Sequence, residues 1–213
     1  SLFALAKQYD LVLIGGDTTQ GTLSITIQLM GTIDKQKMLL RSLAQAGDHI
    51  YVSGTLGDAG LALQYLQKKI TLPESVARAV LPKLNRPEAQ VKLGLALAGA
   101  AHAAIDISDG LAQDLGHILL ASGVGADIYL DQLPLSKSMT QALSRVDAEN
   151  LALSAGDDYQ LCFTLAPDQP LIIQLTPTFQ LTRIGEITDR SGLRIHQNGQ
   201  LITPQILGWQ HFN

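Results

Sequence analysis

The sequence contains little cysteine, tryptophan or charge. Its 213 residues include one cysteine and one tryptophan, and only 16% are Asp, Glu, Lys or Arg, whereas an average soluble domain has about 25%. Hydrophobic residues make up 46%, so neither high charge nor low hydropathy favours disorder. We therefore expect a folded chain with a sizeable core.

The charge balance and the shortness of the apolar runs argue against two classes of partner. The formal net charge is −4, which provides no broad attraction to nucleic acid or to an anionic membrane. The longest apolar stretch, 93–105, is interrupted by His102 and is shorter than the roughly 20 residues that span a bilayer. We expect neither a nucleic-acid partner nor a membrane partner.

The single cysteine and the first residues indicate a reducing compartment. Cys162 has no second cysteine to pair with, and its position in the apolar run 161–165 is typical of a buried core residue. Residues 1–10 contain neither a basic leader nor an apolar segment of signal-peptide length. We expect a cytoplasmic protein and interpret Ser1 as an interior position of a longer chain.

The sequence offers no activated nucleophile. The five histidines share no metal-ligand spacing, and neither a Gly-x-Ser-x-Gly motif nor a Cys and His arrangement points to covalent catalysis. The glycine-rich loop 54–60 could place backbone N–H groups around a phosphate. It lacks the Lys-Ser or Lys-Thr pair of a Walker A loop, so a plain strand-to-helix connection is the alternative.

Helical and strand patterns alternate along the chain, which predicts an α+β fold with helices packed on a sheet, an α/β sandwich. A charged segment over 34–45 indicates a domain boundary near residue 36, and residues 1–36 are too few for a core of their own. Helices are predicted over 2–9, 61–69, 75–81 (ending before Pro82), 88–101 and 112–121, and strands over 11–14, 23–31, 50–53, 103–105, 126–130, 160–165, 181–187 and 193–196, with a turn at 198–199.

Three acidic clusters occupy turns at the ends of predicted strands: 15–19, 106–110 and 156–158. Carboxylates with hydroxyls, and without His or Cys, suit a hard cation such as Mg²⁺, which also binds substrate phosphates. Asp beside Gly or Ser is equally typical of turns and helix caps, and Asp109 before Gly110 is the clearest such cap. Arg41 and Arg86 are candidate cationic partners of a phosphate, or ordinary surface arginines.

These motifs, taken in order, resemble those of the thiamine-monophosphate kinases, a group related to aminoimidazole ribonucleotide synthetase and selenophosphate synthetase. One motif alone would be a weak match, but five occur in register over essentially the whole chain. They are Leu13-Ile-Gly-Gly-Asp-Thr-Thr19, Arg41 with Gly47-Asp-His-Ile-Tyr-Val-Ser-Gly54, Ile105-Asp-Ile-Ser-Asp-Gly-Leu111, Ser154-Ala-Gly-Asp-Asp-Tyr159 and Gly208-Trp-Gln-His-Phe212.

The resemblance implies ATP-dependent phosphorylation of thiamine monophosphate to thiamine diphosphate, assisted by Mg²⁺, in a homodimeric parent protein. It also implies that 1–36 is a remnant of an N-terminal ATP- and Mg²⁺-binding domain and that 37–213 is a C-terminal domain of the aminoimidazole ribonucleotide synthetase-like fold. The residue roles that it implies are Mg²⁺ ligation by Asp17, Asp106 and Asp109, ATP contacts by Gly16, Asp17, Arg41 and Ser108, and thiamine contacts by Asp157 and Trp209.

Two positions depart from the family pattern. Gln20 stands where members commonly have Arg, and Asp157 where they commonly have Glu, so the shorter side chain should weaken or shift a contact. The family also carries roughly a hundred further residues upstream, with additional Mg²⁺ ligands, so we expect this chain alone to be inactive or nearly so. The alternatives are a synthetase of the same group and a non-catalytic module that binds nucleotide or thiamine phosphate.

Overall fold

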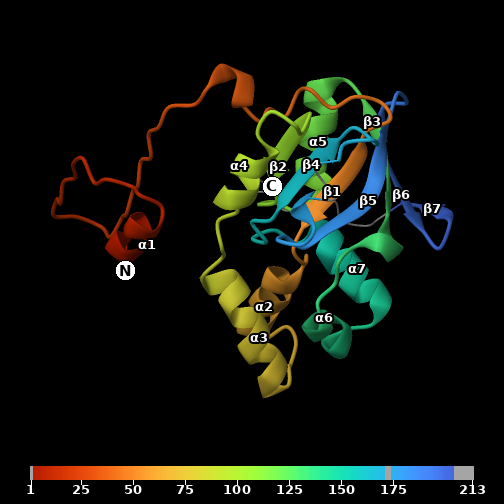
Figure 1. Ribbon diagram of the computed structural model, residues 1–213. Coiled ribbons are helices and arrows are strands. Elements are labelled where there is room, and N and C mark those ends of the chain that lie inside the picture. Colours follow the sequence, from red (N-terminus) through yellow and green to blue (C-terminus); the bar gives the residue numbers. More distant parts are fainter. Residues whose placement is uncertain (1, 171–173, 204–213) are drawn as a thin grey trace. The chain divides into compact units, whose positions relative to one another are not determined.

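The computed structural model describes residues 2–170 and 174–203 and divides into two units, Ser1–Thr32 and Ile33–Asn213. Figure 1 labels the elements of both units along the chain. In the described residues no helix is both long and apolar enough to cross a lipid bilayer. The assignment of 1–36 to an N-terminal domain stays a prediction.

The first unit contains one helix, α1 (Leu2–Gln8), and no strand among residues 2–32. The predicted strands 11–14 and 23–31 are therefore wrong for this chain. Both segments have alternating apolar residues, but the side chains of these residues are exposed to solvent, with Val12 81% and Leu23 88% accessible. A strand needs a neighbour to pair its backbone groups and an opposing layer to bury its apolar face, and this unit offers neither.

The second unit is built on one seven-stranded sheet with the order β2-β4-β1-β5-β3-β6-β7. Neighbouring strands are antiparallel except for β3 and β6, which are parallel. The strands are β1 (His49–Ser53), β2 (Ala103–Asp106), β3 (Gly125–Tyr129), β4 (Leu161–Leu165), β5 (Leu181–Thr188), β6 (Gly192–Gln197) and β7 (Gln200–Ile202).

Helices cover both faces of this sheet, and the side chains of β4, which point alternately to the two faces, show this. Cys162 packs in the core with α5 (Leu111–Ser122) and α7 (Arg145–Ser154), whereas Phe163 and Leu165 pack with α4 (Val91–Leu97) on the opposite face. Successive side chains of a strand point to opposite faces, so the sheet is the middle layer. This arrangement confirms the α+β class.

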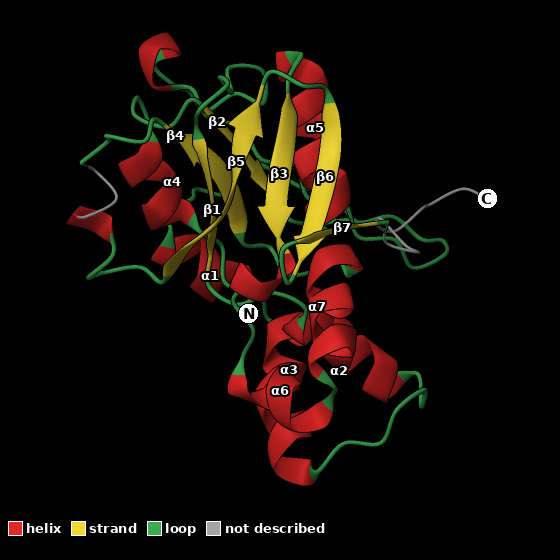
Figure 2. Ribbon diagram, turned by 90° about the vertical axis from the view of Figure 1, so that its right-hand side faces the viewer, coloured by secondary structure: helices red, strands yellow, loops and turns green. Residues whose placement is uncertain are grey.

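The remaining helices form a small lobe beyond one end of the sheet (Figure 2). α2 (Asp58–Leu66), α3 (Glu74–Asn85) and α6 (Lys137–Ala142) enclose their own apolar cluster, which includes Leu61, Val76 and Met139. Two short 3₁₀ helices, η1 (Lys35–Lys37) and η2 (Leu130–Gln132), complete the described elements. Along the chain, α2 follows β1 directly, and α7 lies between α6 and β4.

The helix boundaries correct three predictions. α3 continues through Pro82 to Asn85, because Leu81 and Leu84 pack into the helical lobe and Arg86 N–H still donates to Pro82 O at 2.9 Å. The predicted helix 88–101 shrinks to α4, and α6 and α7 were not predicted. The cap residues of those two helices, Ser136 and Ser144, were the available signal.

Candidate functional site

Two of the three acidic motifs lie side by side where β2 ends and β4 begins. Ile107 N–H donates to Gln160 O at 2.8 Å, Tyr159 N–H donates to Ile107 O at 2.8 Å, and Asp157 N–H donates to Ser108 O at 2.9 Å. These bonds extend the β2–β4 pairing, in which Asp106 is opposite Leu161. Loop 106–110 and loop 154–160, nearly fifty residues apart in sequence, thus form one backbone structure.

The glycines of both motifs permit this close approach. A Cβ atom on Gly156 would lie 2.1 Å from Ser108 O, and one on Gly110 would lie 2.6 Å from Ser154 O. Gly110 also has φ 117°, in the region that L side chains rarely adopt. The sequence signal was the pair of Gly-Asp motifs, but their contact with each other comes from the fold.

Loop 106–110 is held from inside α5 by Asp114. One carboxylate oxygen of Asp114 accepts the N–H groups of Ser108 at 2.9 Å, Asp109 at 3.0 Å and Gly110 at 3.2 Å. Asp114 is buried, and burial raises the pKa of its carboxyl against the lowering effect of these bonds. The prediction that Asp109 caps α5 is therefore wrong, since the N-cap residue of this helix is Gly110 and no side chain caps it.

One of the predicted ligand residues of these two loops, Asp157, contacts the hydroxyl of Tyr159. Tyr159 Oη donates to Asp157 Oδ1 at 3.2 Å. Burial raises the pKa of Tyr159, and the negative charges of Asp157, Asp106 and Asp109 raise it further. Asp106 is exposed, while Ser108, Asp109 and Asp157 are half-buried. The structure therefore brings four predicted site residues together and adds Tyr159, which was part of a motif but had no assigned role.

The carboxylate oxygens of this cluster suit a Mg²⁺ ion that the substrate also coordinates. Within residues 2–170 and 174–203, no three or more His, Cys, Asp or Glu side chains are arranged to hold a metal ion. Mg²⁺ is commonly bound by one or two carboxylates, with waters and substrate phosphates completing its octahedron. Asp106 and Asp109 fit that mode, in which the substrate supplies part of the coordination.

The other predicted site residues lie elsewhere in the chain. Gly16 and Asp17 belong to the first unit, where both are exposed and Asp17 Oδ1 accepts Thr18 N–H at 2.8 Å. Arg41 is exposed in the segment before β1, and its carbonyl accepts Ser122 Oγ–H at 3.0 Å. Trp209 is outside the described residues.

The glycine-rich loop 54–60 does not act as a phosphate cradle. Gly57 N–H, at the start of α2, donates to Asp158 Oδ2 at 2.7 Å, so the protein's own carboxylate occupies this helix terminus. Burial raises the pKa of Asp158 to about 7, against the lowering effect of bonds from Gly57 and Ala59. The structure confirms the alternative, in which this loop is a plain connection between strand β1 and helix α2.

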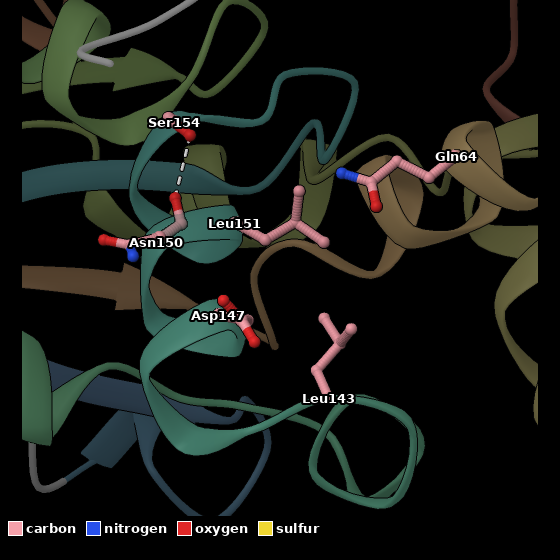
Figure 3. A pocket seen from close by; sticks show the side chains of 6 residues that line it. All are labelled: Gln64, Leu143, Asp147, Asn150, Leu151 and Ser154. Atoms are coloured by element: carbon pink, nitrogen blue, oxygen red, sulfur yellow. Dashed lines mark hydrogen bonds between the residues drawn. The ribbon is translucent and has the colours of Figure 1, made fainter. Parts of the chain in front are cut away.

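A cavity of about 310 Å³ lies beside loop 154–160, between α2 and the helices α6 and α7 (Figure 3). Ser154, at its upper edge, is the first residue of that loop, and Ser154 Oγ–H donates to Asn150 O at 2.8 Å. The cavity therefore adjoins the backbone that carries Asp157. Its lining residues are Gln64, Leu143, Asp147, Asn150, Leu151 and Ser154.

Comparison of this sequence with known proteins shows which family it is similar to. Residues 45–198 match the family described as AIR synthase related protein, C-terminal domain. The thiamine-monophosphate kinase of Haemophilus influenzae is 44% identical over 195 residues, covering 90% of this chain and 60% of the relative. The thiamine-monophosphate kinase of Buchnera aphidicola subsp. Acyrthosiphon pisum is 40% identical over 218 residues, covering 100% of this chain and 68% of the relative. The chain therefore spans about two thirds or less of the length of these curated relatives.

Solved structures give the same family. The crystal structure of thiamine-monophosphate kinase from Stenotrophomonas maltophilia has a TM-score of 0.84 and 45% identity, covering 94% of this chain and 65% of that one. AaThiL complexed with AMPPCP and TMP has a TM-score of 0.69 and 31% identity, covering 83% of this chain and 55% of that one.

Proposed function

Because this chain belongs to the AIR synthase-related family and, within it, to the thiamine-monophosphate kinases, we propose that it is part of an ATP-dependent kinase that phosphorylates thiamine monophosphate to thiamine diphosphate. The neighbour solved with AMPPCP and TMP supports ATP and thiamine monophosphate as the substrates. The chain spans about three fifths of its first relative, so the activity is proposed for the longer protein.

One observation supports this function most directly: backbone hydrogen bonds join loops 106–110 and 154–160, which together carry the carboxylates of Asp106, Asp109 and Asp157. Transfer of a γ-phosphoryl group depends on positioning and on neutralising charge, and it needs little covalent chemistry from the protein. Cys162 is fully buried and its pKa is raised to about 12, so its thiol is unsuited to nucleophilic attack. The site's chemistry matches direct transfer.

Within this proposal each site residue has a role. Asp106 and Asp109 hold Mg²⁺, with Asp17 as a further ligand, and the ion's charge offsets that of the phosphates. Gly16, Asp17, Arg41 and Ser108 contact ATP. Asp157 binds the thiamine moiety, and Trp209 provides an aromatic wall for its ring. Asp114 fixes the backbone of Ser108 and Asp109, so that these side chains meet their ligands without a costly rearrangement.

The remaining parts of the proposal concern the whole protein. We propose that residues 1–36 belong to an N-terminal domain that completes the Mg²⁺ and ATP site, that the protein is a cytoplasmic homodimer, and that this chain alone has little or no activity. The exposed apolar side chains of residues 11–30 support the first point, because a sheet completed by further residues would bury them.

The test is formation of thiamine diphosphate from ATP, Mg²⁺ and thiamine monophosphate. This 213-residue chain and a version with the full length of its relatives are assayed side by side, with Asp106→Asn in the longer version as the site variant. We expect product from the longer version and a loss of about a hundredfold or more in Asp106→Asn. A folded longer version that makes no product would contradict the kinase assignment.

Thiamine binding has a separate optical readout. Trp209 is the only tryptophan of these 213 residues, and the difference in indole fluorescence between the longer version and its Trp209→Phe variant reports on this one residue. We expect thiamine monophosphate to quench it in the longer version, and thiamine without phosphate to do so less strongly. Equal spectra with and without ligand would contradict the role of Trp209.

A further inference from the structure

Resting on the proposed function, we propose that Asp158 is a positioning residue that anchors loop 154–160 to the start of α2 and thereby aims Asp157 at the thiamine substrate. Asp158 follows Asp157 directly, but it faces the opposite way, into the protein. It is 8% exposed, and its Oδ2 accepts Gly57 N–H at 2.7 Å, a partner 101 residues away in sequence.

The anchor point is itself rigid. Gly57 has φ 85°, and a Cβ atom on it would lie 2.9 Å from Ala152 N, so its conformation and its packing against α7 both require glycine. Asp158 also receives a backbone hydrogen bond from Ala59. The first N–H groups of a helix have no partner within the helix, and here a carboxylate from the site loop binds them.

The loop needs such an anchor because its backbone is strained on both sides of Asp158. Asp157 has φ 65° and Tyr159 has φ 48°, both in the left-handed region. A residue other than glycine is disfavoured in this region and persists only where the surroundings hold it. Asp157 and Tyr159 are held on the side of loop 106–110 by their N–H bonds to Ser108 and Ile107.

The consequence for the site concerns the Asp157 side chain. Asp157 carries a shorter side chain than the Glu expected at this position, so its reach depends on the placement of its backbone. A displacement of 1 Å in a site can cost on the order of a hundredfold in rate. With Asp158 bound to α2 on one side and Ser108 bound to Asp157 on the other, that placement is fixed before substrate arrives.

Asp58 provides a matched control at the same helix terminus. Asp58 is 3% exposed, and its carboxylate accepts Thr55 Oγ1–H at 2.7 Å and Ser136 Oγ–H at 2.5 Å. Asp58→Asn therefore perturbs the start of α2 from an equally buried position, through hydrogen-bond partners outside loop 154–160. It also removes a negative charge that raises the pKa of Asp158, and this change favours the Asp158 carboxylate and so keeps the anchor. A general loosening of α2 affects both variants, whereas positioning of Asp157 affects only Asp158→Asn.

The experiment compares wild type, Asp158→Asn and Asp58→Asn in the full-length version at pH 8, above the value of about 7 for Asp158. Steady-state kinetics gives kcat and KM for each substrate, and hydrogen exchange reports the amides of Asp157 and Tyr159. For Asp158→Asn we expect KM for thiamine monophosphate to rise about tenfold or more, KM for ATP to change less than about twofold, and both amides to exchange about tenfold faster. Asp58→Asn should leave KM for thiamine monophosphate and both amides unchanged.

Two results for Asp158→Asn would overturn the positioning role. One is exchange of the Asp157 and Tyr159 amides at the wild-type rate, and the other is faster exchange of these amides with an unchanged KM for thiamine monophosphate. So would an equal rise in that KM for Asp58→Asn. If Asp158→Asn does not fold, Asp158→Glu, which keeps the carboxylate and displaces the loop by one methylene, is judged by the same criteria. Failure of the proposed function looks different, because the wild type itself would then make no thiamine diphosphate.

Discussion

The backbone N–H of Asp157 donates to the carbonyl oxygen of Ser108 at 2.9 Å, which joins the two acidic motifs of the C-terminal unit. The bond leaves the side chains of both loops outside the backbone ladder, where ligands can reach them. In the proposed site the backbone is fixed by the fold, and the polar side chains can contact the substrates.

The closest contact between the two loops makes Gly156 intolerant of a side chain. Gly156→Ala would place Cβ 2.1 Å from the Ser108 carbonyl oxygen, a backbone atom that cannot turn away. We expect the free energy of unfolding to fall by about 3 kcal/mol. Gly116→Ala is the control, because Gly116 lies within α5 with no atom in the way, and it should stabilise the protein by about 0.5 kcal/mol or more. Urea denaturation measures both, and equal effects would contradict the packing argument.

Asp114 should matter for stability as well as for the site. Asp114→Ala leaves the N–H groups of Ser108, Asp109 and Gly110 without their acceptor. We expect a loss of about 3 kcal/mol in the free energy of unfolding. His117→Ala, on the exposed side of the same helix, should change it by less than about 1 kcal/mol. A loss no greater than that of His117→Ala would show that Asp114 does not hold the loop.

Mg²⁺ dependence tests Asp109 directly. In Asp109→Asn the carboxylate becomes an amide, so the concentration of Mg²⁺ at half-maximal rate should rise about tenfold or more at saturating ATP. Asp131→Asn, an exposed acid in η2, removes the same charge away from the two site loops and should not alter it. The measurement is a Mg²⁺ titration of thiamine diphosphate formation in the full-length version. An unaltered midpoint for Asp109→Asn would contradict its role as a ligand.

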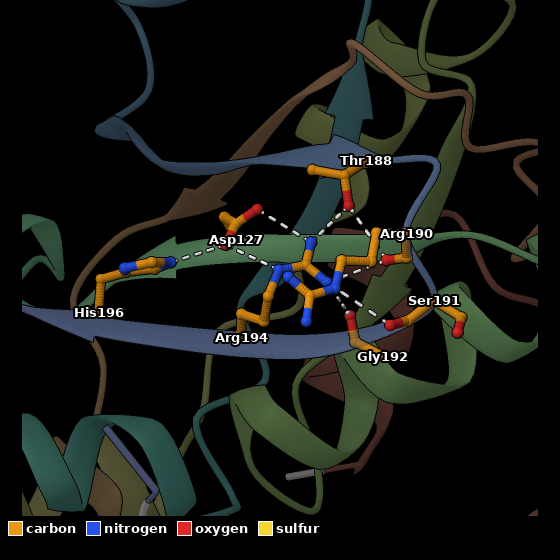
Figure 4. Close-up of polar contacts among 7 residues, drawn as sticks. All are labelled: Asp127, Thr188, Arg190, Ser191, Gly192, Arg194 and His196. Atoms are coloured by element: carbon orange, nitrogen blue, oxygen red, sulfur yellow. Dashed lines mark hydrogen bonds and ion pairs between the residues drawn. The ribbon is translucent and has the colours of Figure 1, made fainter. Parts of the chain in front are cut away.

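Acid sensitivity should come in part from the ion-pair network on β3 and β6 (Figure 4). Arg194 Nε and Nη2 bind the two carboxylate oxygens of Asp127 at 3.0 and 2.9 Å, and His196 Nε2 lies 2.6 Å from Asp127 Oδ1. Hydrogen bonds from Arg194 hold the pKa of the Asp127 carboxyl below its usual value, and His196 adds to this effect. The unfolded chain therefore binds this proton more readily than the folded protein does.

The sign of the pH effect follows from that lowered pKa. The stabilisation by Asp127 is complete above pH of about 5 and is lost as pH falls through its folded pKa. We expect Asp127→Asn to lower the free energy of unfolding by about 1 kcal/mol at pH 7 and to flatten its fall between about pH 5 and pH 2. Asp131→Asn should leave the slope as in wild type. Urea denaturation at a series of pH values measures the free energy of unfolding as a function of pH. If this dependence were the same in Asp127→Asn as in wild type, the role of the network would be contradicted.

Local pattern predicted most elements of the second unit, because burial in a sheet sandwich follows the alternation and helical spacing of apolar residues. Cys162 illustrates this: its apolar neighbours predicted a buried thiol, and it is 0% exposed. The turn predicted at Asn198 and Gly199 is also confirmed between β6 and β7, with φ 50° and 78°. α6 and α7 were missed because their apolar spacing is weak and only their serine caps mark them.

The site was predicted in its residue types and motifs, but its construction was not. Asp109 looked like a helix cap and loop 54–60 like a candidate phosphate cradle. In the fold, Asp114 and Asp158 bind those N–H groups. Asp114 binds N–H groups four to six residues before it, at the start of its own helix. The Asp158 bond crosses 101 residues, so no local pattern could assign that partner.

The sequence by itself determined the family, the kinds of side chain available for chemistry and the alternation of helices and strands, because these depend on residue identity and spacing. Only the tertiary structure decided which acidic turns meet, which carboxylates are structural and which segments pair as strands. Residues 11–14 and 23–31 have the strand pattern but no strand forms there, since pairing needs partner strands as well as propensity. Asp106, Asp109 and Asp157 lie on two paired loops because the fold places the β2 and β4 ends side by side.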